Sequence, residues 1–394
     1  MSFLEKLLDS VIVEWRALES IAKIKHGKDW KGLDEGDVPV YGSGGIMGYV
    51  DTYSYNKPTV LIPRKGSITN VFYVDKPFWN VDTIYYTEIN NQVIIPKYFY
   101  YFITTIDLLS LDTGAGRPSL TQAILNKILV PIPCPENPKK SLEIQEKIVH
   151  ILDTFTAMTA ELTAELKTRK KQYNYYRDKL LSFEEGKVEW MTLGDVTKKW
   201  YSGGTPTAGS SEYYDNGEIP WLRTQEVKFY DIHNTEIKIT EAALKNSAAK
   251  WIPANCVIIA ISGATAGRSA INKIPLTTNQ HCGCLEIDST KALYRYIFHW
   301  VSFNYENIKC LGQGARGDLN SSIIKNFKLP IPYADDPEKS LVEQARIVAI
   351  LDKFDTLTNS INEGLPHEIE LRQQQYEYYR DLLFSFPKPE VVEV

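Results

Sequence analysis

Two segments of this chain are near copies of each other. The stretch RKKQYNYYRDKLLSF at residues 169–183 recurs as RQQQYEYYRDLLFSF at residues 372–386, with 10 of 15 positions identical. Upstream of it, PIPCPENPKKSLEIQEKIVHILDTF at residues 131–155 recurs as PIPYADDPEKSLVEQARIVAILDKF at residues 330–354, with 14 of 25 positions identical. Because an internal repeat divides a chain into equivalent structural units, the fold must accommodate two similar elements about half the chain apart.

Each copy has the periodicity of a long helix. Apolar and aromatic residues recur at alternating spacings of four and three, which is the pattern of a coiled-coil seam. We expect Ser141 to be the N-cap of the first helix, and Ser340 with Glu343 to form a capping box in the second. Gly364 and Pro366 are expected to interrupt the second helix. The predicted seam consists of Ile148, Leu152, Phe155, Leu162, Leu166, Tyr173 and Tyr176 in the first copy and Ile347, Leu351, Phe354, Ile361, Tyr376 and Tyr379 in the second.

A helix with one apolar stripe must bury that stripe against another element. The natural partner of each copy is the other copy. A whole globular segment separates the two copies, so we expect them to pair as an antiparallel intramolecular coiled coil with pseudo-twofold symmetry.

A globular segment precedes each helix. Runs such as PTVLIP in the first segment and NCVIIAIS in the second predict strands. Both segments open with VEW and end at PIP. The sequence therefore predicts an α+β fold in which two globular α/β domains alternate with two long helices. We expect the chain ends to lie near each other, because FLEKLLDS at the N-terminus is similar to RDKLLSF. The predicted boundaries are an N-terminal helical segment at 1–12, a first domain at 13–134, a central helical region at 135–186, a second domain at 187–333 and a distal helical region at 334–394.

Composition narrows the class of protein. No stretch of the sequence approaches the roughly 18 to 20 apolar residues of a membrane span, and the N-terminus has acids inside its apolar run, so we expect a cytoplasmic protein. Five cysteines without a framework spacing suit free thiols in a reducing compartment. A net charge of −5 is no signature of nucleic-acid binding, so any DNA contact must come from local polar and basic loops or from a partner.

The layout resembles the specificity subunit of type I restriction-modification enzymes, over nearly the whole chain. The likeness lies in the helix start shared by both copies (PIP, the glutamine at 145 and 344, IV, ILD), in the YYRD tail, in VYGSGGIMGYVD and LIPRKGSITNV of the first domain, and in GGTPT, IPWLRTQEV and SGATAGRSAI of the second. No single motif is decisive, but their order, repeated twice, is specific.

The resemblance implies a role and a set of partners. In this family two target recognition domains each read one half of a bipartite, non-palindromic site in double-stranded DNA. The helix pair sets the spacing of the two half-sites. Two methyltransferase (modification) subunits dock on the helices, and restriction subunits with motor and nuclease activity join that core. The resemblance therefore implies a non-catalytic subunit without a cofactor.

The sequence carries no catalytic or cofactor motif that contradicts this role. It lacks the [N/D]-P-P-[Y/F/W] tetrapeptide of amino-methyltransferases. In GATAGRS at residues 263–269 the glycines are separated by three residues and followed by arginine, whereas a phosphate-binding loop needs four and lysine. NQHCGC brings His281, Cys282 and Cys284 together, but no second cluster completes a zinc site, which favours core cysteines over a metal site.

Candidate DNA contacts are polar loop residues beside glycines. Arg and Lys recognise guanine, Asn and Gln recognise adenine, and basic side chains also hold phosphates. The alternative is that these residues are solvated turns. Arg117 and Arg316 precede a helix at matching places and suit phosphate contacts common to both domains. The candidates are Tyr41, Ser43, Arg64, Lys65, Ser67, Thr69 and Arg117 in the first domain and Arg223, Thr224, Gln225, Arg268, Asn279, Gln280, Gln313 and Arg316 in the second.

Other functions remain open from the sequence. The outer face of the YYRD segments (Tyr175, Arg177, Asp178) is either a solvated, ion-paired surface or part of a methyltransferase dock. The whole chain could instead be a specificity protein of a related restriction or methylation system. Further alternatives are a coiled-coil scaffold without DNA binding and a self-contained nuclease.

Overall fold

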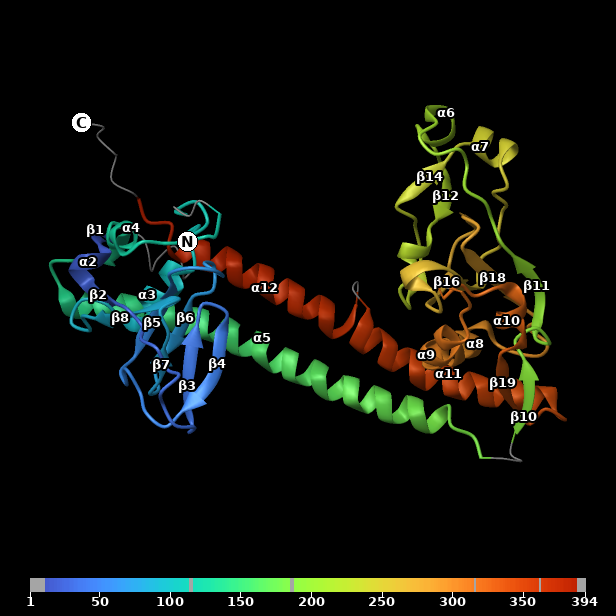
Figure 1. Ribbon diagram of the computed structural model, residues 1–394, viewed down its shortest axis with the longest axis horizontal. Coiled ribbons are helices and arrows are strands. Elements are labelled where there is room, and N and C mark those ends of the chain that lie inside the picture. The colour runs from blue at the N-terminus through green and yellow to red at the C-terminus, as the bar shows by residue number, and fades with distance from the viewer. Residues whose placement is uncertain (1–10, 113–115, 185–187, 315–316, 361–362, 388–394) are drawn as a thin grey trace. The chain divides into compact units, whose positions relative to one another are not determined.

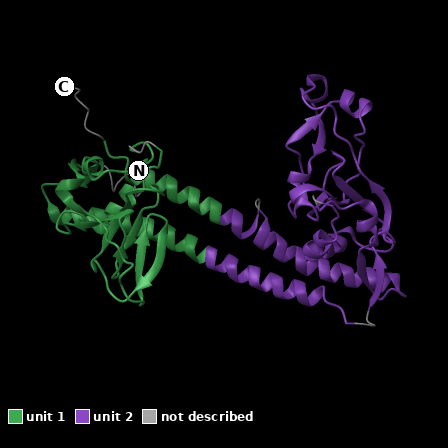
Figure 2. Ribbon diagram, viewed as in Figure 1, with its two compact units in different colours: residues 1–162, 369–394 green, residues 163–368 purple. Residues whose placement is uncertain are grey.

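The computed structural model describes residues 11–112, 116–184, 188–314, 317–360 and 363–387. The chain divides into two compact units, one formed by residues 1–162 with 369–394 and the other by residues 163–368 (Figure 2). Some predictions fall outside the described residues, namely the helical character of residues 1–10, the closeness of the chain ends, and the positions of Arg316 and Ile361.

The globular part of the first unit combines short strands with short helices (Figure 1). Its elements are β1 (Val13–Ala17), α2 (Leu18–Ile21), β2 (Ala22–Lys25), β3 (Val38–Gly42), β4 (Gly45–Val50), β5 (Thr59–Pro63), β6 (Phe72–Val74), β7 (Trp79–Asn80), β8 (Ile84–Ile89), α3 (Pro96–Ile103), α4 (Gln122–Asn126) and β9 (Leu129–Pro133). The strands form a sheet of order β2-β8-β5-β6, a smaller sheet of order β4-β3-β7, and the pair β1-β9. The main core lies between the larger sheet and α3, because Val60 and Ile62 of β5 and Tyr98 and Phe102 of α3 are all buried in one cluster.

The globular part of the second unit has a larger sheet of order β11-β18-β15-β16-β13, a smaller sheet of order β14-β12-β17, and the pair β10-β19. Strand β15 is buried along its length and β18 over its first four residues, because the sheet is covered on both faces. The elements are β10 (Val188–Thr192), β11 (Thr197–Tyr201), α6 (Ser211–Tyr214), β12 (Ile219–Leu222), η1 (Thr224–Glu226), β13 (Asp231–Ile232), β14 (Ile237–Ile239), α7 (Glu241–Asn246), β15 (Val257–Ala260), η2 (Gly263–Thr265), β16 (Ser269–Asn272), β17 (Thr277–Thr278), β18 (Cys282–Ile287), α8 (Tyr294–Phe303), α9 (Tyr305–Cys310), α10 (Ser321–Asn326) and β19 (Lys328–Pro332).

The repeated ends of the two domains have the same structure. In the first unit VEW pairs antiparallel with PIP, so that Trp15 faces Pro131. In the second unit the same pairing places Trp190 opposite Pro330. The strand pair thus closes each domain at the point where the chain enters a long helix.

The long helices are α5 (Pro138–Leu180), α11 (Pro337–Asn359) and α12 (Gly364–Leu383). Figure 1 shows α5 as one continuous helix. The second copy breaks between α11 and α12, as predicted. Gly364 has φ of +77°, and a Cβ there would lie 2.4 Å from the Thr356 carbonyl oxygen, so only glycine fits this break without strain.

The predicted helix starts were wrong by one turn. A proline occupies the first helical position of α5 and of α11, so both helices begin upstream of the serines. The side chains of Asn137 and Asp336 accept hydrogen bonds from backbone N–H groups of the first turn at 3.1 and 3.2 Å. Ser141 and Ser340 are buried inside the helices, and Glu343 pairs with an arginine three residues on instead of capping.

Within each unit the helices pack against one another through aromatic rings. In the first unit Phe155 of α5 stacks on Tyr379 of α12, with ring centroids 5.2 Å apart. In the second unit Tyr176 of α5 stacks on Phe354 of α11 at 5.4 Å, and Tyr173 also contacts Phe354. The partner's residue number falls as the number on α5 rises, so the pairing is antiparallel, as predicted.

Other predicted seam residues contact the globular domains. Ile148 and Leu152 are fully buried in the core that contains α3. Ile347 and Leu351 are equally buried in the core that contains α8. The apolar stripe of each helix start therefore packs on a domain, a contact that the heptad pattern alone does not distinguish from helix pairing. Leu162, Leu166 and Tyr376 are half-buried.

A buried glutamine joins each long helix to its domain. The side-chain oxygen of Gln145 accepts from the backbone N–H of Ile95 at 2.8 Å, and its amide donates to the Val93 carbonyl at 3.1 Å. The side-chain oxygen of Gln344 accepts from the backbone N–H of Leu293 at 2.9 Å, and its amide donates to the carbonyl of Lys291 at 3.3 Å. Both glutamines are fully buried. The glutamine repeated in both copies is thus explained by one interaction made twice, at the N-terminus of α3 and of α8.

Substituting Gln344 by leucine is expected to lower the free energy of unfolding by about 1–3 kcal/mol, because the Leu293 N–H group would stay buried without an acceptor. Val342→Ala, on the same helix at 70% exposure, should change stability by less than about 0.5 kcal/mol. Urea unfolding of both variants measures the difference. Equal effects of the two substitutions would contradict the proposed anchoring role.

Candidate nucleic-acid interface

Three loops meet at one end of the larger sheet in the first unit. The backbone N–H of Arg64, directly after β5, donates to the carbonyl of Thr83, directly before β8, at 2.9 Å. The Arg64 carbonyl accepts from the N–H of Leu120 at 2.7 Å, and Gly66 donates to the Pro118 carbonyl at 3.0 Å. These backbone bonds fix residues from three distant parts of the sequence beside one another.

Charged side chains occupy this junction. The Lys65 ammonium group lies 2.7 Å from the Asp82 carboxylate, and an Arg64 guanidinium nitrogen donates to the Asp82 carbonyl oxygen at 3.2 Å. The hydrogen bond from Lys65 lowers the pKa of Asp82 below its usual value. Asp82 is 58% and Lys65 47% exposed at the side chain, so the pair faces solvent.

The structure brings most of the first domain's candidates together. Ser43 donates its backbone N–H to the Thr83 hydroxyl at 3.2 Å, which places it at the same junction. Ser67 and Thr69 are exposed on the loop that follows β5, and Arg117 is exposed next to the proline that accepts from Gly66. Tyr41 differs, because its ring packs against Phe72 and Phe78 in a small apolar cluster.

The second unit repeats the same backbone arrangement. The N–H of Ile261, after β15, donates to the carbonyl of His281, before β18, at 2.9 Å. The Ile261 carbonyl accepts from the N–H of Leu319 at 2.7 Å. Here the side chains are different: the Ser262 hydroxyl lies 2.6 Å from Nδ1 of His281, and Gln280 accepts from the Thr205 hydroxyl at 2.7 Å.

The remaining candidates of the second domain lie in several places. Asn279 is buried, and its side chain accepts from the backbone N–H of His281, so it shapes the loop. Arg268 is half-buried beside β16, and Gln313 is exposed in a turn closed by a bridge to Asp318. Arg316 lies outside the described residues.

Arg223, Thr224 and Gln225 form a separate group. The Arg223 guanidinium is 2.6 Å from Glu236 and 3.6 Å from Glu226, and the Gln225 amide faces it. Arg223 and Glu236 help to line an open hollow of about 970 Å³ between β12, β14 and the segment around α6. This hollow is wide enough for a base or a phosphate, but two carboxylates already engage the arginine.

Sequence reasoning missed Asp82, Ser262 and His281 as members of the junctions. Asp82 lies one residue before Thr83, outside the glycine-flanked loops, and the NQHCGC pattern around His281 points only to metal binding. The available signal was positional, because the segments that precede β8 and β18 stand at equivalent places in the two domains.

The cysteines that the sequence places beside His281 lie in the core of the second domain. Cys282 and Cys284 are fully buried, and burial raises the pKa of both thiols well above the usual range. The prediction of core cysteines is therefore confirmed. Among the residues that the structure describes, no group of three or more His, Cys, Asp and Glu side chains could hold a metal ion.

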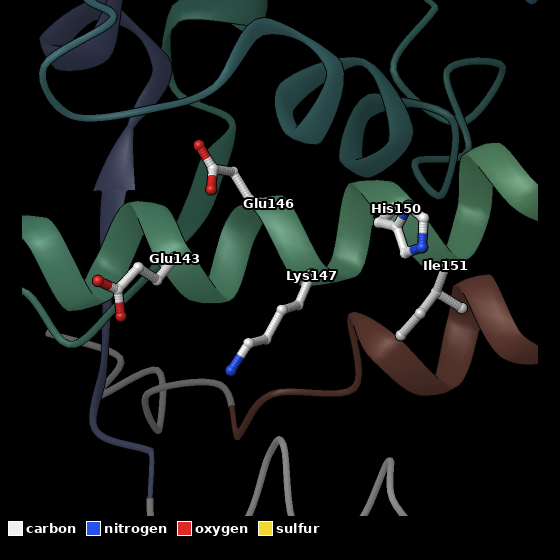
Figure 3. A pocket seen from close by; sticks show the side chains of 5 residues that line it. All are labelled: Glu143, Glu146, Lys147, His150 and Ile151. Atoms are coloured by element: carbon white, nitrogen blue, oxygen red, sulfur yellow. The ribbon is translucent and has the colours of Figure 1, made fainter.

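A hollow of about 390 Å³ lies along the first turns of α5 (Figure 3). Glu143, Glu146, Lys147, His150 and Ile151 line it, all from one face of this helix. Mixed charges on a solvated helix face are ordinary, and no converging set of donors points to a ligand. No helix in the described part of the chain has the length and apolar character needed to cross a membrane.

The fold consists of two domains of matched framework, each of which leads into one copy of a duplicated helix. A family model described as the type I restriction modification DNA specificity domain matches residues 12–170 and again residues 185–371. The chain belongs to this family of specificity subunits of type I restriction-modification systems. The predicted family and fold class are thereby confirmed.

Individual relatives support the assignment over the full length. The chain is 44% identical to the Escherichia coli type I restriction enzyme EcoR124I/EcoR124II specificity subunit, covering 100% of this chain and 99% of that protein. It is 33% identical to a putative type I restriction enzyme specificity subunit of Haemophilus influenzae, covering 98% of each. The crystal structure of a type I restriction-modification S subunit from M. genitalium has the same fold, with a TM-score of 0.65 at 17% identity, covering 98% of this chain and 100% of that one.

Proposed function

We propose that the chain selects the DNA sequence for a type I restriction-modification complex, with each globular domain reading one half of a bipartite, non-palindromic site. The observation that carries this proposal is the pair of equivalent loop junctions. One backbone arrangement presents lysine and aspartate in the first domain and serine and histidine in the second. A shared frame with different side chains is what two readers of different half-sites require.

The long helices suit the task of fixing the half-site spacing. Helix α5 extends over 43 residues without a break and contributes to both units. Two readers on one face of a duplex need half-sites about one helical turn, roughly 10 bp, apart or a multiple of it. A continuous helix holds a distance that a flexible linker does not.

The helices also offer two equivalent surfaces for methyltransferase subunits. Tyr175 is 61% exposed and Tyr378, at the same place of the second copy, is 65% exposed. Each is followed by an Arg–Asp ion pair, at 2.8 Å for Arg177 with Asp178 and 2.7 Å in the second copy. A duplicated exposed surface provides each of two identical partner subunits with the same binding surface. Adenine methylation and DNA cleavage then belong to the partner subunits, and the chain itself performs no catalysis.

Mapping of adenine methylation tests this function. Coexpressed with the methyltransferase subunit from its own host, the chain should direct methylation to one split motif, and deletion of its gene should abolish methylation of that motif. The complex should bind this motif more tightly than unrelated duplexes by about 4–10 kcal/mol. DNA cleavage by the purified chain alone with Mg²⁺, or methylation that persists without the chain, would contradict the proposal.

A further inference from the structure

The two loop junctions have equivalent backbone frames. In the first domain the residue after β5, Arg64, donates its N–H to the carbonyl of Thr83, which precedes β8. In the second domain the residue after β15, Ile261, donates in the same way to the carbonyl of His281, which precedes β18. Arg64 therefore corresponds to Ile261, and Thr83 to His281. The next residues in the loop, Lys65 and Ser262, therefore correspond. A glycine with positive φ follows both, Gly66 at +90° and Gly263 at +74°.

One side-chain pair crosses each junction. In the first domain Lys65 reaches Asp82 at 2.7 Å. In the second domain Ser262 reaches His281 at 2.6 Å. The backbone frame is therefore kept, and Lys65 and Ser262 occupy the same place in it. The partner across the junction differs, because His281 corresponds to Thr83, one residue after Asp82, and the chemistry changes from a cation with a carboxylate to a hydroxyl with an imidazole.

Folding does not account for the Lys65–Asp82 pair. Both side chains are about half exposed, and exposed ion pairs contribute only about 0–1 kcal/mol to stability. The backbone bonds of the junction involve neither side chain. The pair is thus free to serve recognition without cost to the fold.

We infer that these crossing pairs are specificity determinants, Lys65 with Asp82 for one half-site and Ser262 with His281 for the other. This inference rests on the proposed function. An ammonium group donates to O6 and N7 of guanine, and a carboxylate accepts from N4 of cytosine, so the first pair matches the major-groove edge of a G·C base pair. Serine and histidine both donate and accept, so the second pair also suits an A·T base pair.

The ion pair itself sharpens the discrimination. In the free protein Asp82 neutralises Lys65, which weakens the attraction of this lysine to phosphates of any sequence. A G·C base pair replaces both partners at once, because it offers an acceptor to Lys65 and a donor to Asp82. Adenine in place of the guanine puts the N6 donor opposite Lys65 and the thymine O4 acceptor opposite Asp82, and both contacts become repulsive.

The test is the methylation motif of the full complex with Asp82→Asn. We expect selection for G·C at one position of one half-site to fall roughly tenfold or more, with the other half-site unchanged. His281→Asn should lower base selection at one position of the other half-site and leave the first half-site unchanged. The matched control is Glu88→Gln, because Lys25 and Glu88 form another exposed ion pair of the first unit, at 3.5 Å, away from the junction. This control should keep the wild-type motif.

Each outcome decides between the two proposals. An unchanged motif for Asp82→Asn, while the wild-type complex methylates a split site, overturns the inference and leaves the proposed function standing. A wild-type complex without a split motif overturns the proposed function instead. If Asp82→Asn abolishes methylation, selection of bound duplexes from a random pool replaces it as the measurement. Equal loss of affinity for all sequences would then identify a phosphate contact and overturn the inference.

Discussion

Replacing Arg295 by methionine is expected to lower the free energy of unfolding of the second unit by about 2–4 kcal/mol at pH 7, because it leaves two half-buried carboxylates without the cation that both of them contact. Arg295 on α8 is only 17% exposed and contacts Asp231 at 2.6 Å and Asp352 of α11 at 3.1 Å. His299 adds a contact with Asp352 at 2.6 Å. Loss of Arg295 removes the one arginine that joins α8 to two carboxylates.

The effect should depend on pH. Burial alone would raise the pKa of Asp352, but hydrogen bonds from His299 and Arg295 hold it below the usual value. In the wild type this group therefore contributes stability above pH 4 that is lost as the pH falls. Burial raises the pKa of the neighbouring Asp355, and without Arg295 both values rise. The variant then gains stability on acidification, so its deficit should be largest at pH 7 and smaller at pH 5.

The first unit supplies the matched control. Lys97 occupies the place of Arg295 and contacts Asp153 at 2.7 Å, but both side chains are more than a third exposed. Lys97→Met should therefore cost no more than about 1 kcal/mol. Urea unfolding at pH 5 and pH 7 compares the two variants. A deficit of Arg295→Met that is independent of pH, or equal to that of Lys97→Met, would show that the carboxylates left without this cation do not determine the result.

The duplicated helices could be predicted from the sequence because their signals are local. The spacing of apolar residues predicted both helices, and Phe155, Tyr176 and Phe354 do pack between helices. Gly364 predicted the break because its conformation is a property of one residue. The repeat itself indicated that the two domains end in the same way.

The loop junctions could not be predicted in this manner. They depend on backbone hydrogen bonds between residues as far apart in the sequence as Arg64 and Leu120. Backbone hydrogen bonds of this kind produce no periodic pattern of side chains from which they could be predicted. Polar residues of a loop were therefore chosen by type, which included Tyr41 and missed Asp82. In the same way, the pattern showed that Ile148 is apolar and on one face, but not that this face contacts a domain.

Gly203→Ala is expected to damage the second domain severely. A Cβ at residue 203 would lie 1.8 Å from the carbonyl oxygen of Thr278, so the backbone of β17 must shift. Overpacking of this kind costs about 3 kcal/mol when a backbone group must move. Because Thr278 leads directly into Gln280 and His281, the shift also displaces the second junction. The complex should therefore lose selectivity for the half-site that the second domain reads and keep selectivity for the other half-site.

The first domain has an equivalent glycine and an informative control. A Cβ at Gly27 would lie 2.1 Å from the carbonyl oxygen of Val81, the residue before Asp82. Gly27→Ala should therefore lower the selectivity for the half-site that the first domain reads. Gly32 has nothing within 4 Å of its Cβ position, and Gly32→Ala should change neither stability nor motif. Thermal unfolding and methylation mapping of the three variants measure both effects. If Gly27→Ala and Gly203→Ala relaxed the same half-site, the assignment of one half-site to each domain would be wrong, because each glycine supports the junction of its own domain only.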